Sequence, residues 1–229
     1  MFNEESLNLL TNIVQQDLLK AIGETLIMTF LPTLLAFVIG LPLGVLLVTG
    51  DERGIHPLPK PLMQVINIII NLLRSVPFLI LLVVVLPVSR FFVGTSVGTK
   101  AIIVPLTIAA FPFVARLVET SIREVDQGVI EAAQAMGASP MQIVRKVLIP
   151  EAKPSLIANI TVALITIFGY GAMAGVLGGG GLGALAINYG YYRRKDLVMY
   201  VMVVLLIILV QIFQSTGNFI TKRSDKRIR

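Results

Sequence analysis

The sequence predicts an all-α integral membrane protein with about five transmembrane helices, and three observations support this fold class. The mean hydropathy is +0.86, and 55% of residues are apolar whereas 14% are charged. Soluble domains carry roughly 25% charged residues. Long segments also lack any charge, and basic residues gather at their ends. A transmembrane helix needs roughly 20 residues, so a chain of 229 residues is long enough for about five of them. Residues 1–229 are therefore expected to form a single membrane domain.

The first two expected spans differ in how regular they are. The first covers residues 25–50, an uncharged run between Glu24 and Asp51. The second covers residues 62–92 but contains Arg74 and, shortly after it, Pro77. Proline removes a helical hydrogen bond and bends a helix, so this span is expected to be tilted or kinked near residues 75–77.

The third expected span runs from about residue 100 to 122 and carries Arg116 and Glu119 toward its end. Their spacing places both charges on one helix face. Charges inside a bilayer are costly, so these two and Arg74 are expected to face protein or water. The simplest interpretation is that Glu119 forms intrahelical ion pairs with Arg116 and Arg123. The alternative is that these charged residues transmit motion from the polar segment that follows them to the membrane spans. Arg74 is expected to bind carbonyls freed by Pro77 or to lie near a translocation path.

Residues 123–154 form the longest polar interruption, and the sequence predicts two short helices there. Gly137 is a favourable residue just past a helix end, and Ser139 followed by Pro140 is typical of a helix start. Pro150 and Pro154 are expected to stop the second helix before a fourth span begins near residue 155.

The remaining segments complete the expected topology. The fourth span reaches the glycine run 178–183, which reads as a turn rather than a phosphate loop because no Gly-Lys-Ser/Thr follows it. The fifth covers residues 197–221, and residues 1–20 are expected to form an amphipathic helix at the membrane interface. Lys and Arg are more numerous in the segments that an outside N-terminus and a cytoplasmic C-terminus place in the cytoplasm.

Composition also bears on the kinds of site to expect. The chain has no cysteine and a single histidine, so no metal site or cofactor is expected. A net charge of +6 can indicate nucleic-acid binding, but here the basic residues flank apolar runs instead of forming a soluble basic face. We expect contact with membrane lipid and none with nucleic acid.

The polar segment carries a recognisable motif. Glu131, Ala132 and Ala133 are followed by Gly137 six residues after the glutamate, and then by Pro150. This pattern resembles the EAA loop of bacterial ABC importer permeases, although Val147 and Ile149 replace the family's Ile and Leu before the proline. The resemblance implies a type I importer permease fold in the bacterial inner membrane. It also implies that the loop is a cytoplasmic coupling helix that docks on an ATP-hydrolysing subunit.

Longer stretches resemble the methionine-import (MetI-type) permeases in particular. They include the segments around Arg74, the EAA loop and the glycine run. The resemblance implies a homodimer of permeases, two cytoplasmic ATPase subunits and an extracytoplasmic methionine-binding protein, so the chain itself is not expected to be an enzyme. Substrates would be D- or L-methionine, and the alternative is another amino acid.

Met173 is a candidate gate residue. It stands among small residues in the stretch Gly169–Gly175, with Tyr170 nearby. A flexible thioether can close a narrow pore and rotate away; simple helix packing is the alternative.

Two other classes remain as alternatives to an importer subunit. A secondary transporter is expected to carry intramembrane acidic or histidine relays or an inverted repeat, and neither is evident. A membrane scaffold would bind an ATPase without moving a solute.

Overall fold

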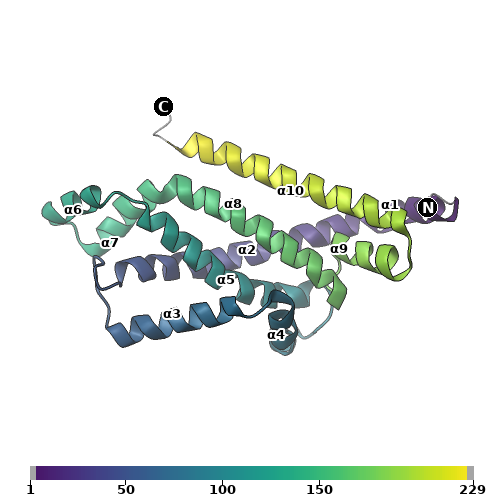
Figure 1. The fold of residues 1–229 in the computed structure, drawn as a ribbon, viewed down its shortest axis with the longest axis horizontal. Coiled ribbons are helices and arrows are strands. Elements are labelled where there is room, and N and C mark those ends of the chain that lie inside the picture. Colours follow the sequence, from purple (N-terminus) through teal and green to yellow (C-terminus); the bar gives the residue numbers. More distant parts are fainter. Residues whose placement is uncertain (1–3, 226–229) are drawn as a thin grey trace. The chain divides into compact units, whose positions relative to one another are not determined.

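The computed structural model describes residues 4–225, and every regular element in that range is helical (Figure 1). The order along the chain is α1 (Glu4–Gln16), α2 (Leu18–Thr49), α3 (Lys60–Ser75), α4 (Phe78–Val93), α5 (Thr99–Arg123), α6 (Gln127–Ala135), α7 (Pro140–Ile143), the π-helical η1 (Val144–Leu148), α8 (Ile149–Ala174), the 3₁₀ turn η2 (Gly175–Leu177), α9 (Gly181–Leu185), the π-helical η3 (Ala186–Tyr192) and α10 (Asp196–Ser224).

The expected spans are present, with changed boundaries. Four continuous helical segments are long and apolar enough to cross a membrane: Leu18–Thr49, Thr99–Arg123, Pro140–Leu177 and Asp196–Ser224. The pair α3 and α4 counts as a fifth span if its break at Val76 and Pro77 is included. That break falls at the expected kink. The first span begins at Leu18 instead of residue 25, because the helix continues past Glu24.

The prediction that Pro150 and Pro154 end the helix before the fourth span was wrong. The helix continues from α7 through η1 into α8, and Pro154 lies inside α8. In η1 the N–H of Ile149 donates to the carbonyl of Val144, five residues earlier. A proline ring normally clashes with the carbonyl four residues before it, and the wider π turn changes that register just before Pro150.

The chain divides into two compact units, each with its own core. The first contains Met1–Leu34, Val76–Ala110 and Leu164–Gln214. One core cluster of this unit joins α1 to α2, α9, η3 and α10, and its buried members are Ile13, Ala21, Leu182, Ala186, Val198 and Met202. The predicted interfacial helix therefore also packs on protein through Ile13, whereas Val14 is exposed. Of the predicted apolar face, the side chain of Leu7 lies outside the described residues.

Within this first unit the glycine run forms the expected turn. Gly178, Gly180 and Gly181 have positive φ, which favours glycine. The carboxylate of Glu24 accepts from the N–H of Gly181 at 2.8 Å, and the Thr25 hydroxyl accepts from Leu182 N–H at 2.9 Å. Glu24 thus fixes the start of α9.

The second unit contains Leu35–Ser75, Phe111–Ala163 and Ser215–Arg229. Here α2 and α5 approach closely at Gly44: a Cβ at that position would lie 2.6 Å from the carbonyl oxygen of Ala115. Small residues permit such approaches between membrane helices. On α5 and α8 the buried Ser121 hydroxyl accepts a hydrogen bond from Asn159 at 2.8 Å. These contacts hold α2, α5 and α8 together beside the polar segment.

Candidate functional site

The first helix of the polar segment, α6, is capped at both ends by its own sequence. The Asp126 side chain accepts from Gly128 N–H at 2.8 Å at the start. At the end, Gly137 has φ +77°, and its N–H donates to the carbonyl of Gln134. The N–H of Ala138 reaches the carbonyl of Ala133, which completes a Schellman motif. The prediction that the first short helix stops at Gly137 is confirmed, since Ala135 is the last residue of α6 and Gly137 follows its cap.

The second helix begins as predicted at Ser139. Its hydroxyl accepts from Gln142 N–H, while the Gln142 side chain accepts from Ser139 N–H at 2.8 Å. This reciprocal capping box, with Pro140 in the first turn, satisfies N–H groups that would otherwise lack partners. The loop from Met136 to Ser139 is therefore a rigid corner.

The motif residues divide between the two sides of this helix pair. Glu131, Ala132, Gly137 and Pro150 are exposed, whereas Ala133 is 5% exposed and faces inward. Ala133 shares the buried side with Ile130, Ile143 and Leu148. The small residue Ala133 thus serves packing within the pair, and Glu131 and Ala132 are available to a partner.

Three apolar residues on the exposed side were missed by the sequence reasoning. Met136 is 82% exposed, Met141 is 58% exposed and Val129 is 43% exposed. Exposed apolar side chains that gather in one place are typical of protein contact surfaces, and methionine adapts to irregular partners. The signal in the sequence was two methionines flanking the Gly137 corner.

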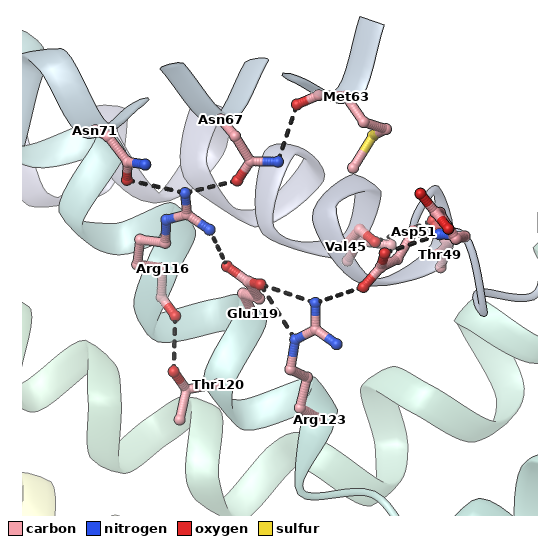
Figure 2. A network of polar contacts seen from close by, with 11 residues as sticks. Val45, Thr49, Asp51, Met63, Asn67, Asn71, Arg116, Glu119, Thr120 and Arg123 are labelled. Carbon is pink, nitrogen blue, oxygen red and sulfur yellow. Dashed lines mark hydrogen bonds and ion pairs between the residues drawn. The ribbon is translucent and has the colours of Figure 1, made fainter. Parts of the chain in front are cut away.

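Arg116 and Glu119 belong to a larger polar network in the second unit (Figure 2). Arg116 donates to Glu119 Oε2 at 2.6 Å, and Arg123 donates to Glu119 Oε1 from Nε at 3.1 Å and from Nη2 at 3.0 Å. Both predicted intrahelical ion pairs are confirmed. The sequence reasoning missed the partners from other elements: Asn67 and Asn71 of α3, which accept from Arg116 at 2.7 and 3.0 Å, and Asp51, which accepts from Arg123 at 2.9 Å.

The network is electrically balanced, since two arginines face two carboxylates. The hydrogen bond from Arg123 holds the pKa of Asp51 below its ordinary value of 3.8. Asp51 is therefore charged at neutral pH. Its contribution to stability is fully present above that ordinary value and is lost as the pH falls through the lowered pKa.

A pocket of about 370 Å³ lies between the network and the helix pair. Asp51 and Arg123 line it from the network side, and Gln127, Ile130 and Leu148 line it from α6 and η1. The network thus reaches the base of the polar segment.

The structure places Arg74 apart from this network. Its side chain is exposed near the end of α3, and among residues 4–225 it makes neither an ion pair nor a hydrogen bond. The predicted contact with carbonyls freed by Pro77 is absent there; the Ser75 hydroxyl instead donates to the Asn71 carbonyl at 2.8 Å.

The two candidate gate residues lie near the end of α8 in the first unit. The Met173 side chain is 50% exposed. Tyr170, one turn earlier, stacks on Phe78 at the start of α4 with ring centroids 4.2 Å apart and planes 5° from parallel. The ring contact thus fixes Tyr170, whereas half of the Met173 side chain is exposed.

Comparison with known proteins places this arrangement in a family. Residues 40–229 match the family "Binding-protein-dependent transport system inner membrane component". The probable D-methionine transport system permease protein MetI of Vibrio cholerae serotype O1 is 50% identical over 210 residues, which span 92% of this chain and 93% of that protein. The D-methionine transport system permease protein MetI of Escherichia coli strain K12 is 52% identical over 158 residues, 69% of this chain and 72% of that one.

Solved structures agree in fold. A chain of the MetNI methionine ABC transporter in inward facing conformations superposes with a TM-score of 0.88 at 48% identity, covering 91% of this chain and 96% of that one. A chain from an amino acid ABC transporter crystallised with histidines has a TM-score of 0.77 at 21% identity, over 97% of this chain and 99% of that one, and shows the fold alone. This is the type I ABC importer permease fold. The chain belongs to the family of binding-protein-dependent transport system inner membrane components, which are multi-pass proteins of the inner membrane.

Proposed function

We propose that this chain is the permease subunit of an ATP-driven importer that moves methionine into the cytoplasm by alternating access. The observation that carries the proposal is the capped α6–α7 corner, which presents Glu131 and Ala132 to a partner. The relatives named D-methionine permeases, identical at about half of the aligned residues, support the substrate.

The proposal includes the partners of such an importer. Two copies of this chain would enclose the path, two cytoplasmic ATPase subunits would hydrolyse ATP, and an extracytoplasmic binding protein would deliver methionine. Membrane proteins can transmit rigid-body motion through rigid elements. The Schellman motif and the capping box make the α6–α7 corner such an element, with Met136 and Met141 as its exposed apolar contacts.

We also propose an outside N-terminus and a cytoplasmic C-terminus. The basic residues Lys222 and Arg223 at the end of α10 lie in the same compact unit as the α6–α7 corner. Basic residues favour the cytoplasmic side, so a single orientation accounts for both.

The decisive test is uptake of radiolabelled D- and L-methionine into vesicles that hold this chain with a co-purified ATPase and binding protein. Glu131→Lys is expected to lower ATP-dependent uptake by tenfold or more, because bringing like charges together at a partner contact costs several kcal/mol. Glu151→Lys is the matched control: an exposed glutamate outside the corner, and it is expected to keep uptake.

Two other outcomes of the uptake experiment would test the substrate and the dependence on ATP separately. Uptake of another amino acid but not of methionine would correct the substrate and leave the permease function standing. Uphill uptake without any ATPase would instead establish the secondary transporter.

The gate proposal for Met173 has its own test. Met173→Ala is expected to raise ATP-independent leak of methionine from loaded vesicles by several-fold, because removing the thioether widens the constriction. Val162→Ala, also exposed and on the same helix, is the control. A leak equal in both variants would show that Met173 only packs against its neighbours.

A further inference from the structure

The network of Figure 2 has an inner end and an outer end that differ in exposure. The side chains of Arg116 and Glu119 are 21% and 13% exposed, whereas those of Arg123 and Asp51 are 49% and 44% exposed. Breaking a buried pair leaves an uncompensated charge and is costly, but an exposed pair contributes only about 0–1 kcal/mol. The Asp51–Arg123 contact is therefore the link that opens at low cost.

The hydrogen bonds of Arg123 are arranged so that breaking its contact with Asp51 leaves no buried charge without a partner. Its Nη2 donates to both Asp51 and Glu119, and its Nε donates to Glu119 alone. If the bond to Asp51 opens, Arg123 keeps its pair with Glu119, and Asp51 gains water. The remaining contacts, from Arg116 to Glu119, Asn67 and Asn71, continue to join α5 to α3.

The Asp51–Arg123 contact also lies at the point where the α6–α7 corner connects to the membrane spans. Arg123 is the last residue of α5, and Asp126, three residues later, caps α6. Asp51 lies just past the end of α2, and it shares a pocket with Arg123, Gln127 and Leu148. Because α6 and the end of α2 line the same pocket, a shift of α6 changes the distance between them.

We propose that the Asp51–Arg123 pair is a latch, meaning a contact that opens and closes during transport, between the end of α2 and the base of the α6–α7 corner. The latch is closed in this structure and opens when the ATPase subunits move α6, whereas the Arg116–Glu119–asparagine contacts stay closed. Asp51 and Arg123 are thus positioning residues, and this inference rests on the function proposed above.

The first test compares Asp51→Asn with Glu52→Gln in the complete importer reconstituted in lipid. Both remove one exposed acidic charge at adjacent positions, but within the described part of the chain Glu52 pairs only with Lys60, and both of those side chains are more than 60% exposed. Asp51→Asn is expected to raise ATP hydrolysis without binding protein by up to about fivefold, the factor that corresponds to about 1 kcal/mol. The number of methionine molecules transported per ATP hydrolysed is expected to fall by the same factor in this variant. Glu52→Gln is expected to match the wild type.

A double-mutant cycle distinguishes a latch from general destabilisation. Arg123→Gln is expected to raise basal hydrolysis as Asp51→Asn does, and the double variant no further than the larger single effect. Independent, multiplying effects would overturn the latch, as would equal effects of Asp51→Asn and Glu52→Gln. Absence of uptake of methionine and of every other amino acid by the wild type would refute the proposed function instead, since the latch is read from basal hydrolysis.

The second test reads the movement directly and leaves the ion pair intact. The chain has no cysteine, so Arg53→Cys with Gln127→Cys, two positions that line the same pocket, can be linked by a bifunctional maleimide. The rate of cross-linking is expected to differ at least about twofold between the nucleotide-free and ATP-trapped importer. The same yield in both states, including no cross-link in either, would overturn the latch.

Discussion

Gly137→Val is expected to reduce ATP-driven methionine uptake by tenfold or more while the protein still inserts into the membrane. Gly137 has φ +77°, and its N–H and that of Ala138 close the Schellman motif at the end of α6. A β-branched residue in this left-handed region costs on the order of 1–3 kcal/mol. The corner would relieve that strain by unwinding the end of α6, and the exposed face carrying Glu131 would lose its fixed position.

A graded series makes this prediction specific to backbone conformation. Asparagine tolerates the left-handed region, so Gly137→Asn is expected to keep most of the uptake, and Gly137→Ala to fall between Asn and Val. No neighbouring atom lies within 4 Å of a Cβ at this position, so lack of space does not contribute. Uptake that followed side-chain volume, with Ala above Asn, would contradict the conformational explanation. The measurement is initial uptake rate per inserted importer.

Gly44→Val is expected to have the largest effect on stability. A Cβ at position 44 would lie 2.6 Å from both the carbonyl oxygen of Ala115 and the Cβ of Val118. Backbone atoms cannot rotate away as a flexible side chain can, so α2 and α5 would have to separate. Overpacking of this kind costs typically about 1–3 kcal/mol, and the unfolding midpoint in detergent should fall by several degrees.

Gly23→Val is the matched control, because Gly23 lies in the same helix and a Cβ added there would meet no neighbouring atom within 4 Å. Glycine is the poorer helix former, so this change is expected to leave the midpoint unchanged or slightly raised. Equal losses at both positions would mean that α2 resists valine in general and that the close approach to α5 is unimportant. Thermal unfolding monitored by loss of the monodisperse detergent complex provides the comparison.

Local sequence rules predicted much of this protein because they act over one helical turn. Charge-free runs set the spans, Ser139 and Gly137 set the ends of the short helices, and the spacing of Arg116, Glu119 and Arg123 predicted their ion pairs. These interactions join residues three to five positions apart, so the pattern of residue types is sufficient. The same reasoning failed at Pro150, where one π turn of backbone lets the helix continue.

Only the tertiary structure decided which residues of different helices contact one another. Asp51 and Asn67 are 72 and 49 positions from their arginine partners, and no periodicity links them. In the sequence Gly44 is one glycine within an uncharged run, but in the fold α2 and α5 approach each other closely at this residue. Such contacts depend on how apolar helix faces pack in three dimensions, which the order of residues along one helix does not specify.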